Sequence, residues 1–391
     1  MRSFVSCKLT EHDAILVLNA VSGFGIKRIR TLIERFGSLS AALQAPIEEF
    51  ISFPGIPQAS RINLQTFNAQ AFLEKDRAAC AAFGATALTF HDDHYPMSLH
   101  DIPDPPAVIY VAGDFPAKLD CSIAIVGSRR ATLYGLKIAG DFATGLAELG
   151  IPVVSGVARG VDAAAHRGAL RAGGATVGVL GCGLDVIYPL ENKDLYLAIR
   201  KNGCLISEFP FGTLPLPSHF PRRNRIVSGL SLGIVVVEAG LKSGALVTAG
   251  FALEQGREVF AVPGRIDSAM SDGSHTLIQQ GAKAVLSIRD ILEDLPLEIL
   301  RPKGSGGETE DDKAVVRGLW GDEKVIFDFI KEGITTYEAL EARTGFSTTT
   351  LLAALLALEL RGKIIQKPGR IYVLGKRADF KGVFDESTQE G

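Results

Sequence analysis

The stretch from residue 122 to residue 156 reads SIAIVGSRRATLYGLKIAGDFATGLAELGIPVVSG, two short β-branched runs separated by a helical pattern. The alternation continues with the apolar runs TVGVLG (176–181), GCLIS (203–207), GIVVVEA (233–239), EVFAVPG (258–264) and KAVLS (283–287). Apolar strands that alternate with helices indicate a parallel sheet covered by helices on both faces. The sequence therefore predicts an α/β fold over residues 84–298, an extended Rossmann-like, doubly wound and mostly parallel sheet.

The segment before this domain, residues 1–83, reads as a series of short helices. Two glycine turns, Ser22–Ile26 and Ser52–Ile56, each lead into a helix. They predict a small helical domain similar to SAM and helix-hairpin-helix domains, in which backbone N–H groups at such a turn can hold a phosphate. A glycine-turned bundle without a ligand is the alternative. Residues 84–120, with several prolines, are expected to lead into the sheet as extended segments.

The segment after the sheet begins with a predicted flexible linker over residues 299–316, because RPKGSGGETEDDK (301–313) contains no apolar residue. Residues 317–375 then spell three helices and a β-hairpin with Pro368-Gly369 at its tip, the pattern of a winged helix, and residues 376–391 are expected to form a disordered tail. The presumed recognition helix has no Lys or Arg before Arg361, which favours a protein-contact or scaffold role over duplex reading.

The amino-acid composition excludes several classes of protein. The 391 residues are 47% hydrophobic and 22% charged, with a formal net charge of −3, so the chain is globular and is not held to nucleic acid by bulk charge. Its five cysteines show no CxxC spacing and its start has no signal-peptide h-region, which favours reduced thiols, a cytoplasmic location and no bound metal. No uninterrupted apolar run is long enough to predict a membrane span.

The first candidate site follows the strand SIAIVG. Gly127 allows a close backbone approach, Ser128 offers a hydroxyl, and Arg129 and Arg130 supply forked, permanently charged donors, with Lys137 in the helix that follows. Ligands of open α/β sheets collect at the carboxyl ends of strands, so we expect a phosphate here. The fingerprint G-x-G-x-x-G is absent after this strand, so the sequence predicts no dinucleotide cofactor.

The second candidate site is the basic run Arg222, Arg223, Asn224 and Arg225 at a predicted helix start. Three arginines within four residues must stay hydrated or find an acid or a phosphate, so an anionic ligand is expected. Neighbouring phenylalanines could stack on bases of single-stranded nucleic acid, although core packing is the commoner role.

A further set of residues lies at predicted strand ends and could support a pocket. Asp162 and His166 are four residues apart on a helix, so they could form an acid–base pair or a structural hydrogen bond. Glu208 and Glu238 could pair with the arginines rather than act in catalysis. The full supporting set is Arg159, Asp162, His166, Glu208, Glu238, Ser243 and Gly244.

The motifs IVGSRRATLYG, VSGVARGVDAAAHRGAL, SEFPFGTLPLPSHFPRRNRIVSGLS and VVVEAGLKSGALVTAGFALEQGREVFAVPG resemble those of the DprA/Smf family of DNA-processing proteins. The resemblance covers about residues 120–285. It implies a homodimeric, cytoplasmic protein that binds and protects incoming single-stranded DNA in natural transformation and loads the RecA recombinase, with single-strand binding protein as a further partner. It also places the family's nucleic-acid pocket on Gly127–Arg130, Lys137 and Arg222–Arg225. His275 departs from the family's usual Asn, which puts a ligand contact from its loop in doubt.

Three classes of function compete. A non-enzymatic single-strand binder that acts as a recombination mediator is the leading hypothesis. The rival is a nucleotide-acting enzyme of the phosphoribohydrolase type, since related sheets use a glycine-rich turn and a Glu; its candidates are Glu238, Asp162 and Arg129. A transcription factor is suggested only by the winged helix.

Overall fold

The computed structural model of the chain describes residues 9–21, 23–45, 49, 58–295, 322–331, 333–360, 363–367 and 371–374. The chain divides into two compact units, residues 1–300 and residues 301–391. The expected linker (299–316) and tail (376–391), the Ser52–Ile56 turn and the Pro368-Gly369 tip lie outside the described residues, as does Arg361.

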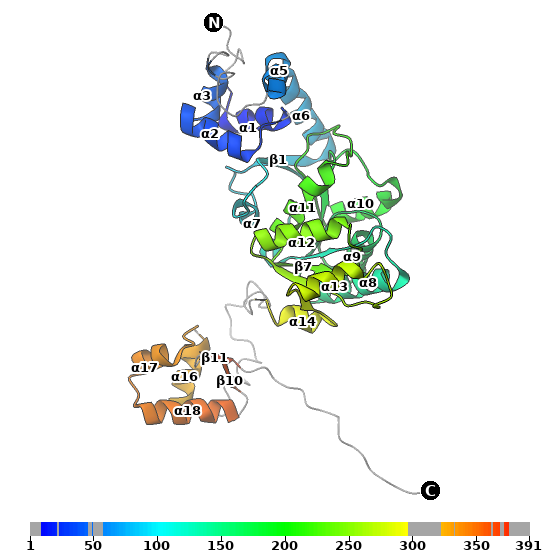
Figure 1. Ribbon diagram of the computed structural model, residues 1–391. Coiled ribbons are helices and arrows are strands. Elements are labelled where there is room, and N and C mark those ends of the chain that lie inside the picture. The colour runs from blue at the N-terminus through cyan, green and yellow to red at the C-terminus, as the bar shows by residue number, and fades with distance from the viewer. Residues whose placement is uncertain are drawn as a thin grey trace. The chain divides into compact units, whose positions relative to one another are not determined.

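The larger unit is built on a nine-stranded sheet with the order β1-β2-β6-β5-β4-β3-β7-β8-β9 (Figure 1). The strands are β1 (Ala85–Thr89), β2 (Val108–Gly113), β3 (Ile123–Val126), β4 (Val153–Ser155), β5 (Thr176–Leu180), β6 (Gly203–Ser207), β7 (Gly233–Val236), β8 (Glu258–Ala261) and β9 (Lys283–Ala284). All neighbouring pairs from β6 to β9 are parallel, and β1 and β2 form an antiparallel edge. The predicted fold class is confirmed, with the seven apolar runs as β3 to β9.

The chain winds outward from β3 in two directions. It passes through β4 and β5 to β6 on one side, and then returns to β7, which lies on the other side of β3 and continues to β8 and β9. The strand order therefore reverses between β3 and β7. In open α/β sheets, ligands bind outside the carboxyl ends of the strands at such a switch point.

Both faces of the sheet are buried. Ala124 and Val126 of β3 contribute to one hydrophobic core, and the alternate residues Ile123 and Ile125 contribute to a second core on the opposite face. The covering helices are α8 (Leu133–Glu148), α9 (Val161–Arg171), α10 (Lys193–Lys201), α11 (His219–Gly229), α12 (Gly244–Glu254), α13 (Asp272–Gln279) and α14 (Ile288–Leu292). Burial on both faces explains why the strands read as continuous apolar runs.

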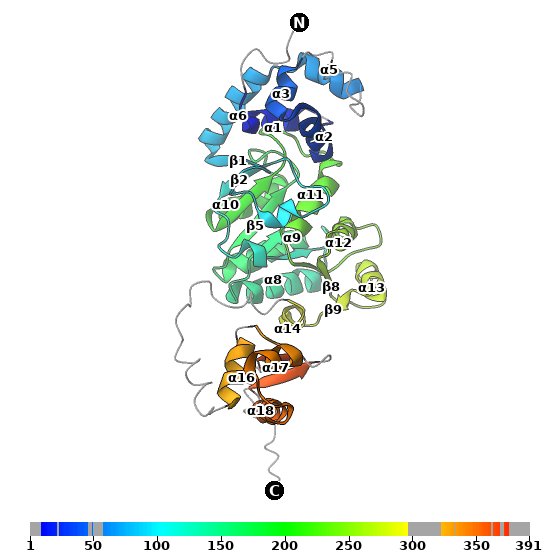
Figure 2. The same ribbon diagram turned by 90° about the vertical axis from the view of Figure 1, so that its left-hand side faces the viewer.

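The N-terminal helices belong to the same unit as the sheet and gather at its β1 end (Figures 1 and 2). They are α1 (Glu11–Ala20), α2 (Ile26–Phe36), α3 (Leu39–Gln44), α5 (Gln58–Thr66) and α6 (Ala69–Phe83); the short α7 (Met97–His100) follows β1. α1 contacts β1 and β2, and Asn19 donates a hydrogen bond to the Glu208 carbonyl oxygen over 3.2 Å. The helical front of the chain is therefore anchored on the α/β core.

The smaller unit contains three helices and a hairpin. They are α16 (Asp322–Lys331), α17 (Tyr337–Thr344), α18 (Thr348–Leu360), β10 (Ile364–Lys367) and β11 (Ile371–Leu374). The two strands pair antiparallel, and buried apolar side chains from the helices and the hairpin form one core. This is the predicted helix–helix–helix–hairpin order. In the part of the chain that the structure describes, no helix is both long and apolar enough to cross a bilayer.

Candidate nucleic-acid interface

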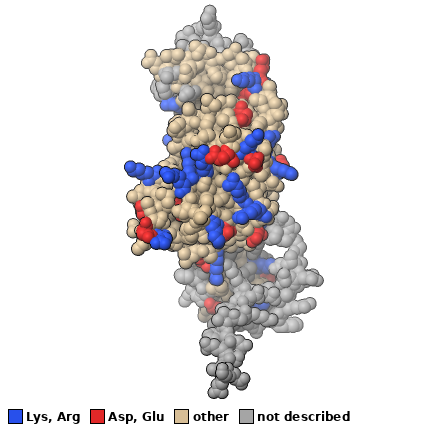
Figure 3. Space-filling model, turned by 90° about the vertical axis from the view of Figure 1, so that its right-hand side faces the viewer, with Lys and Arg blue, Asp and Glu red and all other residues tan. Residues whose placement is uncertain are grey.

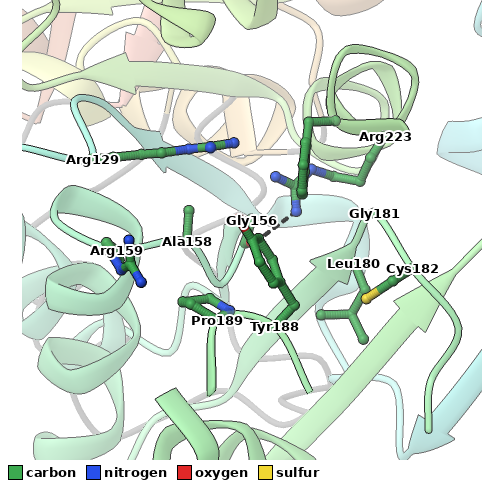
Figure 4. Close-up of a pocket in the computed structure, with 11 residues that line it drawn as sticks. Arg129, Gly156, Ala158, Arg159, Leu180, Gly181, Cys182, Tyr188, Pro189 and Arg223 are labelled. Atoms are coloured by element: carbon green, nitrogen blue, oxygen red, sulfur yellow. Dashed lines mark hydrogen bonds between the residues drawn. The ribbon is translucent and has the colours of Figure 1, made fainter. Parts of the chain in front are cut away.

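A cavity of about 680 Å³, here called the groove, opens at the carboxyl ends of β3 and β7, at the switch point. Its walls are Gly127–Arg130 after β3, Gly240 and Lys242–Gly244 after β7, and the exposed side of α11. A smaller recess adjoins the groove at the ends of β4 and β5 and shares part of its lining; residues that line the recess are drawn in Figure 4. The recess is lined by Arg129, Gly156, Ala158, Arg159, Leu180, Gly181, Cys182, Tyr188, Pro189, Phe220 and Arg223.

The loop after β3 is fixed by contacts that require glycine at its start. A Cβ atom on Gly127 would lie 2.6 Å from Val161 Cγ2 and 2.9 Å from the Glu238 carbonyl oxygen, closer than packed atoms approach. The Ser128 N–H donates to that same carbonyl over 2.7 Å, and the Arg130 N–H donates to Ser128 Oγ over 3.0 Å. The loop is thus held against the β7 exit while its arginine side chains stay exposed.

Arg129 lies over an aromatic side chain at the mouth of the recess. Its guanidinium carbon is 4.8 Å from the Phe220 ring centroid, a cation–π contact. The Tyr188 ring is the aromatic neighbour of Phe220, with 5.6 Å between the ring centroids and an interplanar angle of 33°. Two aromatic rings and a guanidinium plane therefore border the recess, with flat faces on which an unpaired base can stack.

Arg223 forms the floor between groove and recess and is only 4% exposed. Its Nη1 donates to the Gly156 carbonyl oxygen over 2.6 Å, the dashed contact in Figure 4, and also to the Val179 carbonyl. Burial lowers the pKa of Arg223, and the Asp162 carboxylate raises it. Burial raises the pKa of Asp162, which Arg223 and a 3.3 Å hydrogen bond from the Ala158 N–H oppose. Arg223 and Asp162 thus influence each other through space, with no direct ion pair between them in the described structure.

The backbone beside this pair is strained. Val157 has a φ of 56°, the left-handed region that β-branched residues rarely adopt. Asn192 Nδ2 donates to its carbonyl oxygen over 3.0 Å, and the bonds of Arg223 and Asp162 hold Gly156 and Ala158 on either side. Several hydrogen bonds therefore hold this turn in its strained conformation, as is often observed at functional sites.

The basic run on α11 divides between two faces. Arg223 and Asn224 line the groove, whereas Arg222 and Arg225, three residues apart, bind Glu208. Glu208 is 1% exposed and accepts from both arginines at 2.9 Å, and Arg225 also pairs with Asp104 over 3.0 Å. The prediction that a glutamate pairs with these arginines is therefore correct for Glu208. Two of the three arginines of the run, Arg222 and Arg225, pair with this carboxylate inside the protein.

The remaining predicted residues divide in the same way. Gly127, Ser128, Arg129 and Arg130 line the groove, but Lys137 lies outside it and pairs with Asp141 over 2.7 Å. Among the supporting set, Asp162, Ser243 and Gly244 line the groove and Arg159 lines the recess, where it also pairs with Glu191.

Glu238 and His166 are occupied inside the fold. Glu238 pairs with no arginine in the described structure; its two carboxylate oxygens accept from the Thr132 N–H over 2.8 Å and the Thr132 hydroxyl over 2.7 Å. His166 is completely buried, and its Nδ1 lies 2.7 Å from Thr176 Oγ1 rather than on Asp162. Burial lowers the pKa of His166 to about 3, so the ring is neutral. The proposed Asp162–His166 hydrogen bond is wrong, because each side chain has a different partner.

The structure adds groove residues that pattern reasoning missed. Lys242 is exposed at the exit of β7, Met270 lies 3.6 Å from Ser128 Oγ, and Tyr188 reaches the recess from a loop after β5. Lys242 could have been found, because it follows a predicted strand as Arg129 does. His275, by contrast, contacts the Gly264 carbonyl oxygen over 3.1 Å and does not line the groove.

The groove is lined by positively charged side chains. Arg129, Arg130 and Lys242 have no ion-pair partner within the described ranges, and the buried Arg223 is under the coulombic influence of Asp162. On the face shown in Figure 3, Lys and Arg gather over the middle of the described surface. Among the residues that the structure describes, no three His, Cys, Asp or Glu side chains are grouped so that they could hold a metal ion. The arrangement suits a phosphate chain with at least one unpaired base.

Comparisons with known proteins agree on one family. Residues 86–296 match the family described as DNA recombination-mediator protein A, and residues 312–370 match the DprA winged helix domain. The chain is 40% identical to Protein Smf of Escherichia coli over 73% of this chain and 76% of that protein. It is 41% identical to the DNA processing protein DprA of Bacillus subtilis over 66% of this chain and 80% of that one.

Among solved structures, the X-ray structure of DNA processing protein A from Streptococcus pneumoniae is similar with a TM-score of 0.63 and 34% identity. The match covers 74% of this chain and all of that one. With the motif series, the parallel sheet and the winged-helix match all in agreement, the chain belongs to the DprA/Smf family of DNA-processing, recombination-mediator proteins.

Proposed function

We propose that this protein binds single-stranded DNA in the groove and acts as a recombination mediator. The observation that carries the proposal is the combination of three uncompensated cations, Arg129, Arg130 and Lys242, with a recess bordered by Tyr188 and Phe220. Cations spaced along a groove attract a phosphate backbone, and aromatic faces favour bases that are not paired. A duplex keeps its bases stacked inside, so it cannot use the recess.

The mediator role extends this binding activity. We infer that the protein acts in the cytoplasm as a homodimer that protects incoming DNA during natural transformation and brings RecA to strands covered by single-strand binding protein. Supporting this, the family is described as recombination mediators and the relatives are named for DNA processing. Two linked grooves would also raise the effective concentration for a second segment of the same strand.

We propose further that the protein is not an enzyme. Glu238 is the carboxylate expected to act in a nucleotide hydrolase. Its side chain is 3% exposed, and both of its oxygens accept hydrogen bonds from Thr132. Asp162 is only 7% exposed and accepts a hydrogen bond from the Ala158 N–H, whereas a general base needs access to a substrate proton. Incubation with nucleoside monophosphates tests this directly, and release of free base would contradict it.

The mediator role is tested by strand exchange. RecA is supplied with single strands already covered by single-strand binding protein, with and without this protein, and the two proteins are co-precipitated. We expect faster strand exchange and a detectable complex. The matched control is the Arg129→Ala, Arg130→Ala variant, which should lose the acceleration. No acceleration at any ratio, with no complex, would reduce the function to DNA binding alone.

A further inference from the structure

We propose that the bound single strand continues out of the groove onto a patch at its rim, formed by Leu133, Tyr134 and Ile266, where a second base stacks. None of these three residues lines the groove or the recess. The inference rests on the proposed function, because it extends the path of the same strand.

The rim patch contains large apolar side chains that the fold leaves in solvent. Leu133 is 86% exposed, Ile266 is 93% exposed and Tyr134 is 47% exposed. The Tyr134 hydroxyl donates to the Pro263 carbonyl oxygen over 3.1 Å, which ties the start of α8 to the loop after β8. This bond restrains the ring, so a stacked partner would cost little further side-chain freedom.

The patch lies along the same carboxyl edge of the sheet as the groove. The recess lies at the exits of β5 and β4, the arginine loop at β3, Lys242 at β7, and Pro263 and Ile266 at β8. Four inter-strand steps of ~4.8 Å give a track of about 19 Å across the edge. Met270 lines the groove and comes from the same 262–271 segment as Ile266, so groove wall and patch share one loop.

The charges beside the patch fit a nucleic acid. Arg130, three residues before Leu133, is exposed and has no carboxylate partner in the described structure. Arg265 is 83% exposed on the other side, in a pair with Asp267 that an incoming phosphate can exchange for. An apolar surface with a free cation, Arg130, on one flank and an exposed ion pair on the other suits the alternating bases and phosphates of a single strand. We therefore favour the strand over a second copy of the chain as the occupant.

The test compares full-length variants on oligothymidines of about 6 and about 30 nucleotides, the second long enough to leave the groove. Tyr134→Ala and Ile266→Ser probe the patch, and Ile266→Ser leaves the Tyr134–Pro263 bond intact. Leu149→Ser is the matched control, since Leu149 is 45% exposed at the opposite end of α8. Fluorescence anisotropy gives the affinities, size-exclusion chromatography the oligomeric state, and oligonucleotides carrying 5-iododeoxyuridine give photo-cross-links that are mapped by mass spectrometry.

We expect Tyr134→Ala to weaken binding of the long strand by roughly 5- to 100-fold, the range of one lost base–aromatic stack, with the short strand unaffected. Ile266→Ser should weaken binding of the long strand less than Tyr134→Ala does, and Leu149→Ser should change the affinity for neither strand. A photo-cross-link should map to Tyr134.

Two failures are distinguishable. If Arg129→Ala with Arg130→Ala weakens both strands while the patch variants bind both like the wild type, the groove stands and the patch proposal is overturned. If the arginine variant also binds like the wild type, the proposed function itself fails. Patch variants that change only the oligomeric state would show that the patch is covered by a second copy, which also overturns the proposal.

Discussion

The salt dependence of binding measures how many cations in the groove contact phosphates. Arg129, Arg130 and Lys242 are the uncompensated cations that line it. Each phosphate neutralised on a single strand contributes about −0.7 to the slope of log affinity against log salt, so the wild type should show a slope of about −2.1. Between about 50 and about 200 mM salt the affinity should then fall about 20-fold.

Replacing Arg129 and Arg130 with Ala should leave one such contact and a slope of about −0.7. Over the same salt range the affinity of this variant should fall only about threefold. Arg222→Ala is the control, because Arg222 is exposed and basic but turns away from the groove toward Glu208. Fluorescence anisotropy with labelled oligothymidine gives both slopes.

Two results would refute this reasoning. A double variant with the affinity and slope of the wild type would place the phosphate contacts elsewhere. A slope that Arg222→Ala flattens as much as the double variant does would show that the whole basic run contacts DNA, against the division of α11 into two faces.

Three further predictions concern stability and domain organisation. Arg223→Met should lower the free energy of unfolding by ~1–3 kcal/mol, because it leaves the Gly156 carbonyl oxygen without its buried donor; chemical unfolding with Arg130→Ala as the exposed control measures it, and a loss below ~0.5 kcal/mol would contradict this role of Arg223. The pKa of His166 is lowered to about 3, so between pH ~6.5 and pH ~3 the unfolded chain binds a proton that the folded chain does not bind. In this window the free energy of unfolding should decrease by ~1.4 kcal/mol for each unit by which the pH is lowered. His166→Gln should remove this part of the pH dependence, and an unchanged pH dependence would show that His166 is protonated in the folded state. A chain ending at residue 300 should fold and keep its single-strand affinity within about threefold, because the groove lies wholly in the larger unit; loss of nearly all binding would move the site to the winged helix.

Much of the groove could be predicted because its signals are local. Gly127 follows a continuous apolar strand, and the carboxyl ends of parallel strands share one edge, so the loop of Arg129 and Arg130 had to face a ligand edge. The basic run was predicted less well. Its composition indicated an anion, but two of its arginines bind Glu208, and this depends on how α11 is rotated about its axis.

That rotation is set by packing. Ile226 and Val227 are buried against the sheet, which turns Arg223 toward the groove and Arg225 toward Asp104. Asp104 lies 121 residues away in sequence, so no local pattern could reveal the pair.

The sequence by itself determined the parallel sheet, the glycine loop at its ligand edge and the family. A strand that is buried on both faces consists of apolar residues, which can be recognised in the sequence. A Cβ atom at Gly127 would lie 2.9 Å from a backbone carbonyl oxygen, so no other residue fits at this position. The tertiary structure alone decided which charges remain free for a ligand. A cation is free only when no carboxylate reaches it, and that depends on side chains from distant segments that meet only when the core has packed.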